Sequence, residues 1–159
     1  MFLSRVTRQA ILEKAFGFIC ACSQCVLPEP FIAISDALLE RYRRIRDLWR
    51  DDIRDFAFDR RKALAQLQEA EDILFKEAKE GWKSELLEQR FYVHALWGQR
   101  ASAVEAGKSA RGWAEMMDGK KRAWKTDIAR LADRPEAYEM WGLALRDNGG
   151  VLVSRCMLS

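Results

Sequence analysis

Residues 35–56 read SDALLERYRRIRDLWRDDIRDF. Apolar side chains recur in this stretch every three or four positions, which is the period of one face of an α-helix. They are Leu38, Tyr42, Ile45, Trp49, Ile53 and Phe56. Serine is a common residue at helix N-caps, so we predict one long helix from Ser35 to about Phe56. The basic residues between Arg41 and Arg50 enclose Asp47 and continue into Asp51, Asp52 and Asp55, which predicts a solvated helix face.

The chain after this helix repeats the same apolar pattern. Stops are predicted at Gly81 and at Ala106-Gly107, and further helices are predicted to begin at Asp59, Ser84, Ser109 and Pro135. The starts recur at intervals of roughly 25 residues, whereas tetratricopeptide repeats have a period of about 34. We therefore predict an all-α fold in which long antiparallel helices form a tetratricopeptide-like array over residues 35–146. Trp49 and Trp124 are predicted to face its core.

The predicted helical domain has a boundary at each end. Leu27-Pro28-Glu29-Pro30 contains two prolines, which lack a backbone donor and bias the preceding residue to extended geometry. These prolines predict a linker over residues 28–34. After Asn148-Gly149-Gly150 the chain is short, apolar and β-prone, and we predict a disordered tail over residues 147–159.

Three of the four cysteines lie in residues 16–25, which read FGFICACSQC. Side chains two apart in an extended segment point the same way, so Cys20 and Cys22 present their sulfurs on one side. A turn through Ser23 and Gln24 brings Cys25 to join them. Clustered cysteines in a reducing compartment bind metal more often than they form disulfides. We predict a structural Zn²⁺ site with three thiolates, and free structural thiols are the alternative.

A tetrahedral Zn²⁺ site needs a fourth ligand, which the cysteine motif does not supply. His94 is the only histidine, and it lies in a helical pattern without a second histidine at helical spacing. Cys156 is the remaining cysteine, in the predicted tail. His94 and Cys156 are therefore candidates for the fourth ligand. The simpler interpretations are that His94 is a packed or surface side chain and that Cys156 is a free thiol.

Residues 8–25 read RQAILEKAFGFICACSQC and resemble the post-SET segment of SMYD-type SET-domain proteins, especially fungal ones. That family carries an Arg-Gln pair, a short helix, an aromatic-Gly-Phe step and the Cys-x-Cys-x-x-Cys spacing. The following helices resemble the family's C-terminal region less specifically. We therefore expect residues 1–27 to be a post-SET-like segment, with a helix over Val6–Phe16 that is capped by Thr7 and stopped by Gly17.

The resemblance implies that the parent protein is an S-adenosylmethionine-dependent protein-lysine methyltransferase. In the family, a cysteine beside an Asn-His-x-Cys motif of the SET core supplies the fourth zinc ligand. That motif is missing from this sequence, so we expect the chain to be a C-terminal piece of a longer protein or a truncated gene model. By resemblance, Phe18 stacks on the adenine of the cofactor and Phe16 lines the target-lysine channel. The alternative is that Phe16 and Phe18 form an apolar pair that anchors the zinc knuckle, the segment with Cys20, Cys22 and Cys25, to the helices.

Composition narrows the remaining function classes. The 27 basic and 24 acidic residues are mixed along the chain, so a nucleic-acid interface is not indicated. No apolar run is long enough to span a membrane, and early arginines argue against a signal peptide, so an intracellular protein, cytoplasmic or nuclear, is expected. No catalytic triad, carboxylate pair or phosphate loop is present, so we expect no enzyme activity from this chain alone.

Two functions remain open from the sequence. In the first, the chain is the C-terminal part of a SET-domain methyltransferase, whose helices form a wall that binds a protein substrate or partner and whose S-adenosylmethionine site needs the SET core. In the second, it is a stand-alone helical-repeat module for protein interaction, in which a small zinc site staples the N-terminus.

Overall fold

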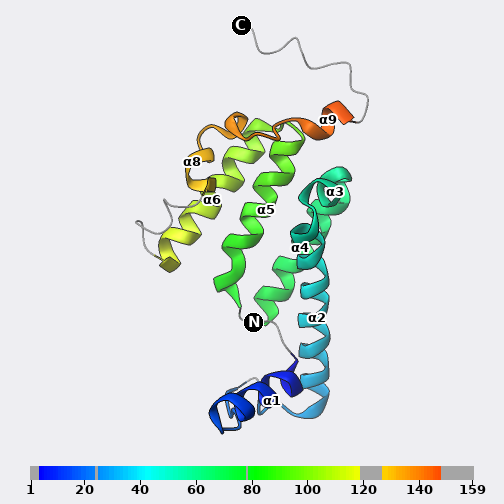
Figure 1. Ribbon diagram of the computed structural model, residues 1–159, viewed down its shortest axis with the longest axis vertical. Helices are drawn as coiled ribbons and strands as arrows, with labels where there is room; N and C mark the ends of the chain where they lie inside the picture. Colours follow the sequence, from blue (N-terminus) through cyan, green and yellow to red (C-terminus); the bar gives the residue numbers. More distant parts are fainter. Residues whose placement is uncertain (1–3, 24, 78, 119–126, 148–159) are drawn as a thin grey trace, which may run out of the picture.

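The computed structural model describes residues 4–23, 25–77, 79–118 and 127–147, and every regular element in these ranges is helical. The predicted all-α class is therefore confirmed. Consecutive long helices run antiparallel, with α5 packed between α4 and α6 (Figure 1). The elements are α1 (Arg5–Phe16), α2 (Glu29–Asp51), α3 (Ile53–Phe58), α4 (Arg60–Lys76), η1 (Glu80–Trp82), α5 (Lys83–Leu96), α6 (Arg100–Asp118), α8 (Asp127–Leu131), η2 (Pro135–Ala137) and α9 (Leu143–Asp147).

Helix α1 carries its own caps. The Ser4 hydroxyl oxygen accepts a hydrogen bond from the backbone N–H of Thr7 at 3.3 Å, so the predicted cap at Thr7 is wrong by three residues. At the other end Gly17 has a φ of 68°, a left-handed conformation that glycine adopts without steric cost. The predicted stop at Gly17 is confirmed. No residue of α1 is buried.

Helix α2 begins inside the stretch that was predicted to be a proline linker. Pro28 is its N-cap, and Pro30 lies in its first turn. The backbone N–H groups of a first helical turn have no intrahelical acceptor, so a proline there costs no hydrogen bond. The linker over residues 28–34 and the cap at Ser35 are therefore wrong. The Ser35 hydroxyl instead donates a hydrogen bond to Glu77, which ties α2 to the end of α4.

The predicted helix over residues 35–56 is divided at Asp52. Asp52 has an extended backbone, and its carboxylate accepts a hydrogen bond from the N–H of Arg54 at 2.7 Å, which caps α3. Asp59 caps α4 in the same way, by accepting from the N–H of Lys62 at 3.0 Å. The predicted start at Asp59 is confirmed. These two capped turns reverse the chain, so that α4 packs against α2.

The boundaries between α4, α5 and α6 differ from the prediction. The stop at Gly81 lies beyond α4, and the stop at Ala106-Gly107 and the start at Ser109 lie inside α6. The chain turns into α6 at Gly98, whose φ is 62°. Gly107 allows α6 to approach Ala132 closely, because a Cβ at this position would lie only 3.0 Å from the Cα of Ala132. The helices consequently do not start at the predicted even interval, and the tetratricopeptide-like array stays a prediction.

The C-terminal part is less regular than predicted. Pro135 begins η2, a single 3₁₀ turn, and α9 begins only at Leu143, after Gly142 with its φ of 66°. A continuous helix from Pro135 is therefore wrong. Trp124, and the predicted tail apart from Asp147, lie outside the described residues.

Most of the buried side chains form two clusters, one between α2, α3, α4 and α5 and the other between α5, α6 and α8. Trp49 is 3% exposed in the first cluster and packs edge-on against Tyr42 and Phe56. Phe91 is fully buried in the second. The predicted inward face of α2 is thereby confirmed. Neither cluster contains a described residue from before Leu38.

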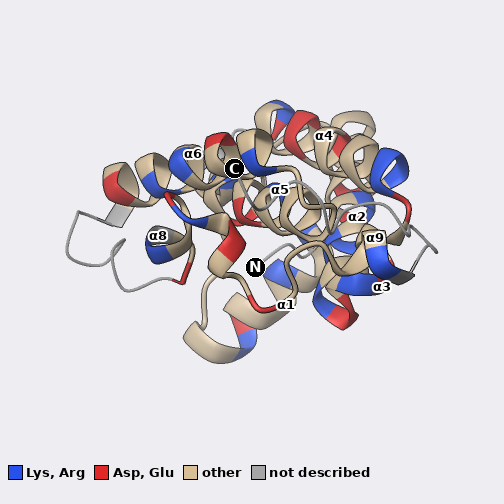
Figure 2. Cartoon of the chain, turned by 90° about the horizontal axis from the view of Figure 1, so that it is seen from above, with Lys and Arg blue, Asp and Glu red and all other residues tan. Residues whose placement is uncertain are grey.

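The outer faces of the helices carry mixed charge (Figure 2). Arg41 of α2 pairs with Glu69 of α4 at 2.7 Å, and Lys83 and Arg90 of α5 both contact Glu71 of α4. Of the basic side chains between Arg41 and Arg50, Arg41 is thus paired with an acidic residue of a neighbouring helix. Among the helices of the described ranges, none combines the length and the apolar character that a membrane span requires.

Candidate metal centre

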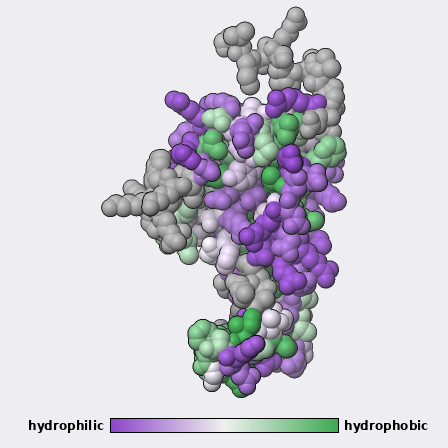
Figure 3. Space-filling view, viewed as in Figure 1, coloured by the Kyte–Doolittle hydropathy of each residue, from purple (hydrophilic) through white to green (hydrophobic). Residues whose placement is uncertain are grey.

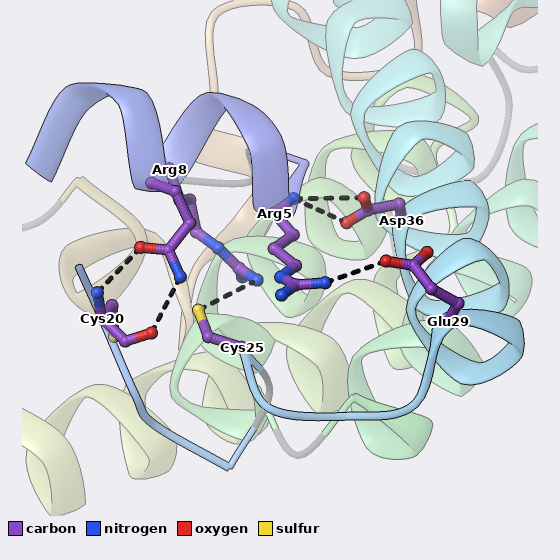
Figure 4. A network of polar contacts seen from close by, with 7 residues as sticks. Arg5, Arg8, Cys20, Cys25, Glu29 and Asp36 are labelled. Carbon is purple, nitrogen blue, oxygen red and sulfur yellow. Dashed lines mark hydrogen bonds and ion pairs between the residues drawn. The ribbon is translucent and has the colours of Figure 1, made fainter. Parts of the chain in front are cut away.

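The cysteine motif lies at one end of the molecule, where α1 and the loop after it pack on the beginning of α2 (Figure 1). Two contacts of Arg5 hold α1 there. Its backbone N–H donates to both carboxylate oxygens of Asp36, at 2.9 and 3.1 Å. Its guanidinium pairs with Glu29 at 3.2 Å (Figure 4). Because α1 buries no side chain, polar contacts such as these position it.

Gln9 of α1 clamps the first cysteine. Its side-chain nitrogen donates to the carbonyl oxygen of Cys20, and its side-chain oxygen accepts from the N–H of Cys20, both at 2.8 Å. The amide thus pairs with both backbone groups of Cys20, as the backbone of a neighbouring β-strand would. This pairing fixes the first cysteine relative to α1.

A tight turn brings the third cysteine back to the first two. The N–H of Cys25 donates to the carbonyl oxygen of Cys22 at 2.8 Å, and the N–H of Val26 donates to the same oxygen at 3.1 Å. These bonds confirm the predicted turn between Cys22 and Cys25; Gln24, the second residue on which the turn was predicted, lies outside the described residues.

The three sulfur atoms lie within 4.8 Å of one another. Sulfurs bound to one Zn²⁺ at about 2.3 Å lie about 3.8 Å apart in a tetrahedron, so a small contraction accommodates the ion. Exposure differs among the three: Cys22 is exposed, Cys20 is intermediate and Cys25 is 3% exposed. The predicted cluster of three thiols is confirmed, and its donor set suits a metal ion that prefers sulfur.

The thiol of Cys25 is held in its protonated form. Burial, followed by hydrogen bonds with Cys22 and Cys20, raises the pKa of Cys25 to about 11. The guanidinium of Arg8 opposes this effect, and its nitrogen lies 3.9 Å from the Cys25 sulfur (Figure 4). A bound cation would displace the thiol protons, so metal binding at this cluster should release protons.

A fourth protein ligand does not join the cluster from the described part of the chain. His94 lies on α5, and its Nδ1 is hydrogen-bonded to the side-chain oxygen of Gln99 at 2.8 Å. The structure therefore does not bring His94 to the cysteines. Cys156 lies outside the described residues.

The aromatic pair predicted to contact a cofactor flanks Gly17. The rings of Phe16 and Phe18 have centroids 6.4 Å apart, and the side chains are 71% and 49% exposed. Neither belongs to a buried cluster. The alternative that this pair anchors the knuckle to the helices is therefore not supported.

Two positioning residues were not recognised in the sequence. The role of Gln9 toward Cys20 and the role of Asp36 toward Arg5 depend on contacts between distant positions. For Gln9, the sequence offered one signal: the Arg-Gln pair at residues 8–9 is part of the motif that resembles a post-SET segment.

Comparisons with family models, curated proteins and solved structures found no match to this chain. The resemblance to SMYD-type proteins therefore rests on residues 8–25.

Proposed function

We propose that Cys20, Cys22 and Cys25 bind Zn²⁺ as the post-SET knuckle of a SMYD-type lysine methyltransferase, and that the helices from α2 onward bind its protein substrate or partner. The observation that carries this proposal is the gathering of three thiols within 4.8 Å on a backbone held by Gln9. Thiolate donors favour zinc over the hard cations, which prefer oxygen. A structural zinc would fix the loop that carries all three thiols, and the Gln9 clamp on Cys20 would connect this loop to α1.

Exposed apolar side chains near the three thiols support the presence of a second domain that covers this surface. Of the 15 large apolar side chains that are exposed in the described residues, nine precede Ser35. Figure 3 shows apolar surface over the part of the molecule that holds α1 and the beginning of α2. An apolar surface of this kind is typical of an interface. The nine are Val6, Ile11, Phe16, Phe18, Ile19, Val26, Leu27, Phe31 and Ile34.

In this proposal the SET core covers the apolar surface and supplies the fourth zinc ligand. The exposed rings of Phe16 and Phe18 then border the S-adenosylmethionine pocket, which only the assembled protein completes. Both rings are free of the helical core, so burying them against a second domain costs no internal contact. An in-frame Asn-His-x-Cys motif in the DNA upstream of the Met1 codon would support this assignment.

A stand-alone interaction module is the second candidate. It is favoured by the self-sufficiency of the helical part, whose two buried clusters use no described residue from before Leu38. In this case the zinc site is a local staple, and its fourth ligand must come from the chain itself or from solvent.

Metal analysis tests the zinc site and separates the two candidates. We expect one zinc per chain that a chelator removes readily, because three thiolates hold the ion less tightly than four. Hydrogen exchange should then show faster exchange in α1 and in the loop to Leu27, while α4, α5 and α6 keep their protection. Cys22→Ser should lose the metal, and Ser23→Ala is the matched control that should retain it.

Two outcomes would count against the first candidate. Absence of zinc from the protein after growth in zinc-supplemented medium would contradict the metal site itself. Zinc that resists chelation and depends on His94 or Cys156 would indicate a site completed within this chain, and would favour the stand-alone module.

A further inference from the structure

The three thiols differ in how they meet solvent. Cys22 is exposed, whereas Cys25 is 3% exposed, and none of the three is joined in a disulfide. An oxidant from solvent therefore reaches Cys22 first. The sulfur of the sheltered Cys25 lies within 4.8 Å of the exposed sulfur of Cys22.

Of the two disulfides that include the exposed Cys22, the backbone favours the one with Cys25. The hydrogen bond from the N–H of Cys25 to the carbonyl oxygen of Cys22 closes a turn of four residues. The Cα atoms at the ends of such a turn lie within about 7 Å, close to the range that a disulfide spans. Cys20 and Cys22 are separated by one residue in an extended segment, where a disulfide would be strained.

We propose that the cluster is a redox switch, in which a hydroperoxide oxidises Cys22 and Cys25 to a disulfide and thereby releases the metal. The release of zinc rests on the proposed function, whereas the disulfide step does not. The geometry assigns the roles: Cys22 is the sulfur that reacts with the oxidant, Cys25 is the resolving thiol, and Cys20 is left reduced.

The chemistry has two steps. The sulfur of Cys22 attacks the O–O bond of the hydroperoxide, which gives a sulfenic acid on Cys22 and one molecule of alcohol, or water from hydrogen peroxide. Cys25 then gives up its proton and attacks the sulfenic sulfur as a thiolate, and the sulfenic hydroxyl leaves with that proton as water while the S–S bond forms. Two thiols lose two electrons in total, and the hydroperoxide gains them. When both sulfurs begin as zinc-bound thiolates, two protons come from solvent and Zn²⁺ leaves as the aqua ion.

Oxidation would act on the N-terminal segment and leave the helices in place. Cys20 alone cannot hold Zn²⁺, which needs four ligands in a structural site. All three ligands lie in the loop after α1, so losing the metal frees the loop, including the Cys20 backbone to which Gln9 of α1 is bonded. The apolar surface around the thiols would then lose its fixed shape, and with it the ability to bind a covering domain.

The test uses the full chain with Cys156→Ser, so that the fourth cysteine cannot exchange with the cluster. The zinc-loaded protein is titrated with hydrogen peroxide while a chromogenic chelator reports released metal. Peptide mass spectrometry then locates the disulfide. We expect one zinc released for each Cys22–Cys25 disulfide, and recovery of both zinc and thiols after a dithiol and zinc are added.

Single variants assign the roles of the sulfurs in metal-free, reduced protein. Cys22→Ser should slow peroxide consumption at least about tenfold, because the exposed sulfur is lost. Cys25→Ser should leave a sulfenic acid on Cys22 that a dimedone probe traps. Cys20→Ser is the control and should still form the disulfide at a similar rate.

The outcomes distinguish this inference from the proposed function. A chain that binds no zinc yet forms the Cys22–Cys25 disulfide would refute the zinc site and retain the thiol pairing. A zinc-loaded chain that keeps its metal after oxidation, or that forms mainly a Cys20–Cys22 disulfide, would overturn the switch.

Discussion

Alanine at Gly107 and at Gly112 is the same chemical change made twice in α6, and we expect opposite effects on the free energy of unfolding. A Cβ on Gly107 would lie 3.0 Å from the Cα of Ala132 and 3.1 Å from the Cδ2 of Phe91. A Cβ on Gly112 would meet no atom within 4 Å. Carbon atoms pack best at about 3.5 to 4.0 Å, so only the Gly107 variant creates a clash.

The magnitudes follow from two opposing effects. Alanine is more favourable than glycine inside a helix by about 1 kcal/mol, so Gly112→Ala should raise the free energy of unfolding by about 0.5 to 1 kcal/mol. At Gly107 the same gain is opposed by overpacking, which costs about 1 to 3 kcal/mol. The nearest atom is backbone and cannot rotate away, so we expect a net loss of about 1 to 2 kcal/mol.

Urea denaturation followed by far-ultraviolet circular dichroism measures both variants under the same conditions. The double variant should show the sum of the two effects, because the sites share no contact in the described structure. If Gly107→Ala proves as stable as Gly112→Ala, then α6 does not approach Ala132 as closely as described, and the packing argument is refuted.

Trp49→Ala should lower the free energy of unfolding by about 3 to 5 kcal/mol, because it leaves a cavity between two aromatic neighbours. Trp49→Phe should lower the free energy of unfolding much less, since the buried indole N–H has no hydrogen-bond acceptor in the described structure. If Trp49→Ala denatures like the unmodified chain, the inward face of α2 is contradicted. Burial, with a smaller contribution from Glu85, raises the pKa of Glu88 from 4.5 to about 7. The native state therefore binds more protons than the unfolded state across that range, and stability should fall as the pH rises from about 4.5 to about 7. Glu88→Gln should flatten this decline in denaturation curves taken across the range, and an unchanged pH profile would contradict the burial of the carboxyl group.

The sequence pattern predicted helices correctly where the spacing of apolar residues along one helix was sufficient. The spacing of Tyr42, Ile45 and Trp49 requires only that a helix has about 3.6 residues per turn, and all three are buried. Gly17 and Asp59 were predicted correctly for a similar reason, because a helix cap acts on its own turn.

Boundaries that depend on distant contacts were not predictable in this way. Gly107 looks like a helix stop in the sequence, and only the approach of Ala132 explains why glycine stands inside α6. Pro28 and Pro30 look like a linker, yet they lie at positions where a helix start tolerates proline. Glycine can end a helix or allow close packing inside one, and proline can occur in a linker or in a first helical turn. The surrounding structure decides which of these applies.

The sequence by itself determined which thiols gather, because the spacing of Cys20, Cys22 and Cys25 needs only an extended segment and a turn. Tertiary structure decided how they are held and which one meets solvent. The clamp of Gln9 on Cys20 joins residues 11 positions apart, and the tie of Arg5 to Asp36 joins residues 31 apart. Neither follows from a repeating pattern, since such contacts depend on how α1 packs against the loop and α2. That packing leaves Cys25 buried and Cys22 exposed.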